Sequence, residues 1–262
     1  MTKIVIFGSG DHAKVIFSEV IKLKKFKFLG FVDDFKKKGE LIISSNKKNY
    51  YNLGSIKEVI NKKNNLKGII GVGLNFVREK IVKDIKKINN NFKFQQIISK
   101  DAIINSNVFI DEGTLVVSGT TINTGTKIGR HCIINTSCSI DHDNKFSDFS
   151  SVGPGVVTGG NVEVGYQSYL GLGSLVRHNV KILDYKKKIN VDILVLPGVG
   201  SFPVAMSNIK KNEVDLRIFD HVEKNKTIFG GCGSACSHPT RNTINPNKTS
   251  IFFILIKLNF SF

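Results

Sequence analysis

A glycine-rich turn near the N-terminus contains the residue types that bind a phosphate group. Lys3–Phe7 has the composition of a buried strand and runs into Gly8-Ser9-Gly10, and the spacing beyond it predicts a helix over roughly Ala13–Lys24. Glycine lets the backbone approach a phosphate closely, and the N-terminus of a helix favours negative charge. The alternative is a tight strand–helix turn without a ligand, because the third glycine of the GxGxxG pattern is missing.

Other polar groups in the first third of the chain can complete such a site. A predicted strand over Phe28–Val32 ends in Asp33 and Asp34, about twenty residues after the turn, where a dinucleotide fold holds a ribose. His12 stands at the predicted helix start, and its position fits a ligand group and a solvated cap residue equally well.

Another candidate site is a histidine between two aspartates, Asp141-His142-Asp143, which follows the apolar Ile140. A polar corner without function is the alternative. The corner is unusually acidic, and titratable groups with perturbed pKa values cluster at functional sites, so we favour a functional role.

The elements that position these residues are of two kinds. Two further predicted elements, a short strand over Gly68–Val72 and a helix over Phe76–Ile88, complete a small βαβ domain in the first hundred residues. The middle of the chain instead repeats every six residues from Ile104, and thirteen of the fourteen positions are large and apolar. The fourteen positions, of which Thr158 is the exception, are Ile104, Ile110, Val116, Ile122, Ile128, Ile134, Ile140, Phe146, Val152, Thr158, Val164, Leu170, Val176 and Ile182.

A period of six predicts a triangular parallel β-helix with one hexapeptide per side and about three per coil. The large residue fills the interior, and a smaller residue two positions earlier fits a tight inner site. Cys132 and Cys138 fall on these smaller positions, so we expect buried structural thiols. The apolar residue is often followed by Gly, Asn or Asp, and we expect these residues to adopt the backbone conformation of the corner. An ordinary Val/Ile-rich β-sheet is the alternative.

The motifs GSGDHAKVI, FVDD and IDHDNKFSDFSSVGPG, in this order, resemble the sialic-acid O-acetyltransferase and UDP-amino-sugar N-acetyltransferase family of bacterial glycan biosynthesis. The resemblance covers residues 1 to about 176. It implies a left-handed β-helix and acetyl transfer from acetyl-CoA to an amine or hydroxyl of a UDP-linked amino sugar or a sialic-acid-type sugar. It also implies a homotrimer with each active site between neighbouring β-helices.

The resemblance also assigns roles to single residues. His142 matches the general base that takes the acceptor's proton, Asp143 the carboxylate that orients the imidazole, and Asn135 an active-site asparagine. Residues that match the nucleotide-sugar side are Gly8, Ser9, Gly10, His12, Asp33, Asp34 and Gly73. Residues that match the acetyl-CoA side are Ser151, Gly160 and Gly171. Ser151 stands where the family commonly has a second histidine, and serine can donate a hydrogen bond but carries no positive charge.

The C-terminal third resembles a different protein. DILVLPGVGSFPVAM, within roughly Val180–Gly230, is similar to the glutaminase subunit of imidazole glycerol phosphate synthase, and Cys232 stands at that family's nucleophile position. The histidine and glutamate of its triad are absent, and a cysteine without its base is a poor catalyst. We therefore expect an inert Cys232 in a truncated fragment, joined to a truncated acetyltransferase near Ser174–Lys181. Predicted strands here are Asp192–Leu196 and Thr227–Phe229, and predicted helices are Val204–Lys211 and Glu213–Lys224.

The predicted organisation has four parts. Residues 1–100 form an α/β, Rossmann-like nucleotide-sugar-binding domain, and residues 101–182 form a left-handed β-helix. Residues 183–230 form an α/β amidotransferase-like fragment, and residues 231–262 are an unassigned tail.

Composition excludes several other classes of protein. The net charge of +17 is concentrated in residues 1–100 and is almost all lysine without a nucleic-acid motif, so we expect no nucleic-acid partner. Only four cysteines in a chain of this length argue against a disulfide scaffold. They include no CxxC metal-binding pair, so we expect no metal. No apolar run of membrane-spanning length and no signal peptide are evident, so a cytoplasmic protein is expected.

Three functions remain open. The first is an acetyl-CoA-dependent sugar acetyltransferase, and the second is a non-catalytic sugar-nucleotide-binding remnant of such an enzyme, fused to an inactive amidotransferase fragment. The third is a glutaminase, which the missing triad residues disfavour.

Overall fold

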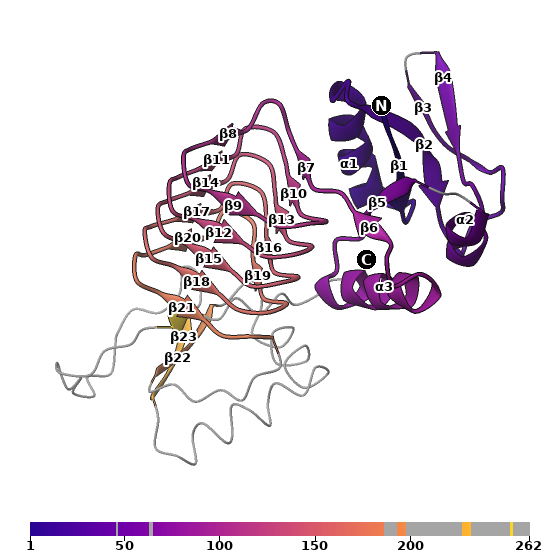
Figure 1. Cartoon of the computed structure of the whole chain (residues 1–262). Coiled ribbons are helices and arrows are strands. Elements are labelled where there is room, and N and C mark those ends of the chain that lie inside the picture. Colours follow the sequence, from indigo (N-terminus) through magenta and orange to yellow (C-terminus); the bar gives the residue numbers. More distant parts are fainter. Residues whose placement is uncertain (46, 63–64, 186–192, 198–226, 232–251, 254–262) are drawn as a thin grey trace. The chain divides into compact units, whose positions relative to one another are not determined.

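The computed structural model describes residues 1–45, 47–62, 65–185, 193–197, 227–231 and 252–253 (Figure 1). The chain divides into two compact units, Met1–Asn179 and Val180–Phe262. The division lies within Ser174–Lys181, the stretch where the sequence analysis places the junction between two partial proteins.

The first unit begins with an α/β domain built on a parallel four-stranded sheet in the order β2-β1-β5-β6. Its elements are β1 (Thr2–Phe7), α1 (Asp11–Lys22), β2 (Phe26–Val32), β3 (Leu41–Ser45), β4 (Lys48–Tyr51), α2 (Ile56–Lys62), β5 (Leu66–Ile70), α3 (Asn75–Ile88) and β6 (Lys93–Phe94). The predicted strands and helices of this domain are present with shifted ends. The sequence analysis missed the antiparallel hairpin of β3 and β4 and the helix α2.

Alternation along β1 gives this sheet two apolar faces. Ile4 and Ile6 pack in one core with Phe17 of α1. Val5 and Phe7 pack in a second core that includes residues of α2 and α3. Helices therefore cover both faces, as a parallel sheet requires, and the carboxyl ends of β1, β2 and β5 lie side by side.

The rest of the first unit is a parallel β-helix, which confirms the fold expected from the hexapeptide repeat. Two-residue strands stack in three sheets, and each strand pairs with the strand eighteen residues later. The first sheet holds β7 (Ile97–Ile98), β10 (Leu115–Val116), β13 (Ile133–Ile134), β16 (Ser151–Val152) and β19 (Tyr169–Leu170). The second holds β8 (Ile103–Ile104), β11 (Thr121–Ile122), β14 (Ser139–Ile140), β17 (Val157–Thr158) and β20 (Leu175–Val176). The third includes β9 (Phe109–Ile110), β12 (Lys127–Ile128), β15 (Lys145–Phe146) and β18 (Glu163–Val164).

The interior positions predicted from the repeat are the second residues of these strands, and most are buried. Most of the smaller residues two positions earlier are buried as well, and several donate to a carbonyl fifteen residues later. Thr126 Oγ1, for example, donates to the Asp141 carbonyl at 2.8 Å. Cys132 and Cys138 are free and buried, as expected, and burial raises the pKa of Cys132 to about 11.

The corner conformation differs from the expectation. Positive φ recurs every six residues, three positions after the interior residue, and not at the Gly or Asn that directly follows it. Gly129, one of those following residues, is small for another reason: an added Cβ would lie 2.9 Å from the Asp148 backbone nitrogen in the next coil. Stacking of coils, not backbone handedness, therefore accounts for glycine at that position.

The outward side chains differ among the three sheets. Those of the first sheet are buried except for the partly buried Tyr169, and Ile97, Leu115 and Ile133 join the core that contains α1. Those of the third sheet include the charged Lys127, Lys145 and Glu163. Those of the second sheet are all uncharged: Ile103, Thr121, Ser139, Val157 and Leu175.

The second unit contains β21 (Lys181–Ile182), β22 (Ile193–Pro197), β23 (Thr227–Gly231) and β24 (Phe252–Phe253). The last three form a parallel sheet in the order β23-β22-β24. Both predicted strands of this region are present, and Phe252–Phe253 of the unassigned tail adds a third. Cys232 and the helices predicted over 204–211 and 213–224 lie outside the described residues.

Candidate functional site

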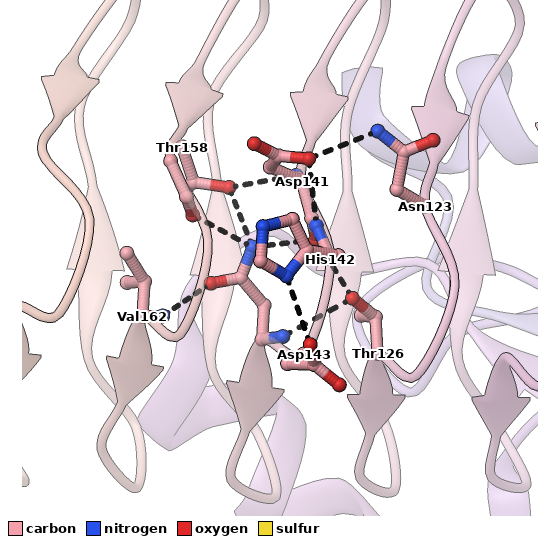
Figure 2. A network of polar contacts seen from close by, with 9 residues as sticks. Asn123, Thr126, Asp141, His142, Asp143, Thr158 and Val162 are labelled. Carbon is pink, nitrogen blue, oxygen red and sulfur yellow. Dashed lines mark hydrogen bonds and ion pairs between the residues drawn. The ribbon is translucent and has the colours of Figure 1, made fainter.

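The first candidate site is the corner that follows β14 of the second sheet (Figure 2). The His142 Nδ1 and the Asp143 Oδ2 lie 2.8 Å apart, and about half of the His142 side chain is exposed to solvent. A carboxylate only accepts hydrogen bonds, so in the neutral imidazole Nδ1 carries the proton and Nε2 keeps its lone pair. This geometry agrees with the prediction from the sequence that Asp143 orients the His142 ring.

The backbone of this corner is held from both neighbouring coils. The Asp143 N–H donates to the Thr124 carbonyl at 3.0 Å, and the His142 carbonyl accepts from the Asn161 N–H at 3.0 Å. Asp143 adopts a φ of 57°, a conformation that costs a non-glycine residue free energy and persists where the surroundings enforce it.

Asp141 supports the same corner from the other side. Its Oδ1 accepts from the His142 N–H at 2.8 Å and from Asn123 Nδ2 at 3.1 Å (Figure 2). Asn105, one coil earlier, donates to the Asn123 side chain at 2.7 Å. These three residues form a polar column along successive corners, and the column fixes the start of the turn that presents the imidazole.

Asn144 is the buried anchor of the turn. Its Nδ2 lies 2.8 Å from the Asp141 carbonyl and 2.9 Å from the Thr158 hydroxyl, and its Oδ1 accepts from the Val162 N–H at 2.6 Å. Asn144 is fully buried, so losing it would leave several polar groups unpaired. The sequence analysis missed this residue, although an asparagine at a small inner position was a usable signal.

Two glycines make room for the His142 and Asp143 side chains. An added Cβ at Gly160 would lie 2.5 Å from the His142 Nε2, and one at Gly125 would collide with the Asp143 carboxylate. Gly160, predicted to lie near acetyl-CoA, is thus placed beside the free nitrogen of His142.

The electrostatics of the corner favour a protonated imidazole. The hydrogen bond that His142 Nδ1 donates to Asp143 is the main cause that raises the pKa of His142, and the charge of Asp141 adds to it. The same corner lowers the pKa of Asp141, chiefly through the bond from the His142 backbone. A raised pKa makes His142 a stronger base once the proton has left.

The second candidate site is the turn between β1 and α1. Gly8 has a φ of 98°, which favours glycine, and Gly10 faces open space, since nothing lies within 4 Å of an added Cβ. Gly10 also precedes the first turn of α1 without a side-chain cap. The turn therefore leaves backbone N–H groups and space for an anionic group.

Asp33 lies beside this turn. Its Oδ2 accepts from the Ser9 hydroxyl at 2.6 Å, and its N–H donates to the Asn52 side chain at 3.0 Å. Asp34 has a different role, because its Oδ1 accepts from the Ile56 N–H at the start of α2 at 2.8 Å. The two adjacent aspartates therefore separate into one at the turn and one that caps a helix.

His12 is not a solvated cap residue. Its Nε2 is buried without a hydrogen-bond partner among the described residues, and burial lowers its pKa to about 4. Gly73 lies against it, since an added Cβ would be 3.9 Å from the His12 Cγ. The predicted nucleotide-sugar residues Gly8, Gly10, His12, Asp33 and Gly73 are thus brought together by the ends of β1, β2 and β5.

Three predicted residues lie away from His142. Asn135 and Gly171 occupy corners that follow the first sheet, and the Asn135 side chain accepts from the Thr136 N–H at 2.8 Å. Ser151 is 2% exposed, accepts from Arg78 at 2.8 Å and donates to Asn75 at 2.7 Å. Among the described residues, no hydrogen bond joins these three to the His142 corner.

Arg78 and His131 are buried polar residues that the sequence analysis missed. Arg78 falls on the apolar stripe of α3 with Val82 and Ile85, which was a usable signal. His131 stacks on Phe149 with ring centroids 5.1 Å apart. In the described part of the chain, no cluster of three or more His, Cys, Asp or Glu side chains suits a metal ion, and no helix is long and apolar enough to span a membrane.

Residues 3–85 match the family described as the PglD N-terminal domain. The structure is similar to a histidine-to-alanine variant of GDP-perosamine N-acetyltransferase from Caulobacter crescentus in complex with CoA and GDP-perosamine. The identity is 25%, the TM-score is 0.62, and the match covers 74% of this chain and 85% of that chain. The acetyltransferase domain of PglB from Neisseria gonorrhoeae shares the fold at 22% identity and a TM-score of 0.62, over 74% of this chain and 88% of that chain.

A separate, short similarity agrees with the second resemblance drawn from the sequence. The imidazole glycerol phosphate synthase subunit HisH of Prochlorococcus marinus is 45% identical over 51 residues, which is 20% of this chain and 24% of that protein. The chain thus spans about a quarter of the length of the curated relatives it matches.

Proposed function

We propose that this protein transfers an acetyl group from acetyl-CoA to an amine or hydroxyl of a nucleotide-linked amino sugar or a sialic-acid-type sugar. The observation that carries the proposal is the 2.8 Å contact between His142 Nδ1 and Asp143 Oδ2, which leaves Nε2 free beside Gly160. The similarity to a sugar N-acetyltransferase at 25% identity supports this chemistry, with an amine as the first acceptor to test.

His142 acts as the general base of the transfer. The acceptor nitrogen attacks the thioester carbonyl carbon, a C–N bond forms, and the C–S bond breaks. His142 Nε2 takes the proton from the acceptor and returns it to the departing sulfur, so the products are an amide and the CoA thiol. Asp143 stabilises the imidazolium that exists between these two proton transfers.

The β1–α1 turn binds the nucleotide part of the acceptor. The backbone at Gly8–Gly10 and the start of α1 hold a phosphate, and the Asp33 carboxylate accepts from a ribose hydroxyl. The bond from Ser9 at 2.6 Å fixes the Asp33 carboxylate at the turn. A nucleotide sugar bound in this way is held with few contacts to the sugar itself, which leaves its amine free to react.

The working form is a homotrimer. The second sheet presents only uncharged outward side chains, of which Ile103, Val157 and Leu175 are 60%, 41% and 76% exposed. The first sheet is covered by the α/β domain, so the second sheet is the apolar face left for another copy. His142 lies at the edge of this face, and the active site forms there between neighbouring β-helices, with Asn135 as an active-site residue and Gly171 near the acetyl-CoA.

The proposed compartment is the cytoplasm, where free thiols such as Cys132 and Cys138 persist. The amidotransferase-like part takes no role in this reaction, and we propose that Cys232 is inert.

The test is CoA release by the purified full-length protein from acetyl-CoA and a UDP- or GDP-linked 4-amino sugar, with sialic acid as the hydroxyl acceptor. We expect His142→Ala to lower the rate by about 10³-fold because the general base is lost. Lys127→Ala, a change on the third sheet, serves as the control and should leave the rate unchanged. An unchanged rate in His142→Ala contradicts the assignment. Sugar-nucleotide binding without transfer in the wild type favours the non-catalytic remnant, and ammonia release from glutamine favours the glutaminase.

A further inference from the structure

The buried guanidinium of Arg78 in α3 joins the α/β domain to the β-helix. Arg78 is 1% exposed and donates to the carbonyls of Val72 and Gly73, in the loop after β5, at 3.1 and 3.0 Å. It also donates to the carbonyls of His131 and Phe149, at equivalent corners of successive coils, at 2.8 and 3.0 Å. One side chain therefore fixes a loop of the first domain against two coils of the second.

Arg78 is buried without a hydrogen-bonded carboxylate among the described residues. Its remaining acceptors are the Asn75 side chain at 2.7 Å and the Ser151 hydroxyl at 2.8 Å, so every acceptor it has among the described residues is neutral. Burial lowers the pKa of Arg78 to about 10. Burying a cation without a paired carboxylate costs free energy, and an apolar side chain of similar volume would avoid that cost. The directed bonds from Arg78 to main-chain carbonyls of both domains therefore indicate a geometric role.

The same helix contacts a third coil. Asn75 Nδ2 donates to the carbonyls of Gln167 and Ser168 at 2.8 and 3.1 Å, and the Gln167 side chain donates to Glu79. The first turns of α3 therefore bind three successive corners through main-chain carbonyls. Such fixed dipoles define the position of the helix along the β-helix axis as well as its distance from it.

Arg78 contacts structural parts of both candidate sites. On one side, an added Cβ at Gly8 would lie 3.0 Å from Val72 Cγ2, so the loop held by Arg78 packs against the predicted phosphate turn. On the other side, the coil between His131 and Phe149 carries His142. We propose that Arg78 is a positioning residue that fixes the sugar-nucleotide turn relative to the coils that carry His142, in the arrangement that acetyl transfer requires. This inference rests on the proposed function.

The experiment compares Arg78→Met and Arg78→Lys with Arg130→Met, an exposed arginine paired with Asp148 at 2.8 Å. Binding of acetyl-CoA and of a GDP-linked amino sugar is measured separately by calorimetry, and transfer by single-turnover kinetics with both bound. We expect Arg78→Met to keep both affinities and to lower the transfer rate by about 10²-fold, because misplacement of one substrate by an ångström has this effect. Arg78→Lys keeps the charge and has three donors, so its transfer rate should lie between those of the wild type and Arg78→Met. The transfer rate of Arg130→Met should match the wild type.

Hydrogen exchange separates this inference from the proposed function. In Arg78→Met, amides of residues 72–78 and of the corners at His131 and Phe149 should exchange faster, while those of α1 and β14 stay protected. Unchanged exchange, or an unchanged transfer rate in a folded Arg78→Met, overturns the positioning role. If Arg78→Met does not fold, Arg78→Lys decides in the same way. A wild-type protein that binds both substrates and transfers no acetyl group overturns the proposed function. Hydrogen exchange in Arg78→Met then still tests whether Arg78 holds the two domains together.

Discussion

His142 and His131 stand at corners of the same coil of the β-helix and differ in almost every physical property. The His142 side chain is 49% exposed and bonded to a carboxylate, which raises its pKa. His131 is 2% exposed, with an Nδ1 that has no partner among the described residues, and burial lowers its pKa to about 3. One imidazole is suited to exchange protons near neutral pH, and the other stays neutral and packs as an aromatic ring.

The corners themselves account for this difference. His142 follows the second sheet, whose outward residues are uncharged and exposed in a single copy. His131 follows the third sheet at a corner covered by α3, between Phe94 and Phe149. The repeat supplies equivalent backbone positions, and the elements packed around each corner decide which of them performs chemistry.

After His142→Ala, the largest loss of transfer rate should come from Asp143→Asn. The amide can donate to Nδ1 and move the imidazole proton to Nε2, so we expect the transfer rate to fall roughly 10²-fold. Asp143 raises the pKa of His142, and the base must be neutral to act. The acid limb of the pH–rate profile should therefore move to lower pH in the variant. Asp111→Asn, at a corner after the third sheet, is the control, and equal losses in both variants would contradict the pairing.

A smaller effect is expected from Gly160→Ala. The added methyl would lie 2.5 Å from the His142 Nε2, and the exposed ring can turn away from it. We expect about a tenfold loss of transfer rate from the displaced base, with no change in melting temperature. Steady-state kinetics and a thermal melt check this together, and a variant with full activity would show that Nε2 does not face the reacting atoms.

The smallest effect on activity is expected from His131→Phe. Phe149 occupies the equivalent corner one coil later with a φ of 59°, close to the 54° of His131, so the site accepts a phenyl ring. Replacing the unpaired buried nitrogen should raise the free energy of unfolding by roughly 1 kcal/mol and leave the transfer rate unchanged. Denaturant unfolding measures this, and a large loss of activity would mean that the two histidines are not functionally distinct.

The sequence predicted the repeat and the His142 corner because both depend on local order in the chain. Interior residues such as Ile122 and Ile140 recur at a fixed interval, and the Asp141-His142-Asp143 triplet is contiguous. Arg78 could not be assigned in this way. Two of its partners are main-chain carbonyls 53 and 71 residues away. Every residue has such a carbonyl, so no residue type in the sequence marks these partners.

Positions of the corner glycines show a further limit. The sequence identified a preference for Gly, Asn or Asp just after the interior residue but attached it to backbone conformation. The left-handed positions lie two residues later and are filled by residues as different as Gly125, His131 and Phe149. Packing of the neighbouring coil enforces that conformation, so residue type marks it only weakly.

The most direct test of the account is a titration of the histidine rings by nitrogen NMR, with His142→Ala and His131→Phe used for assignment. Between about pH 5 and pH 8, His142 should titrate with a pKa above the usual range and carry its neutral-state proton on Nδ1. His131 should remain neutral throughout. A His142 that titrates below the usual range, or that carries its proton on Nε2, would contradict its role as the general base.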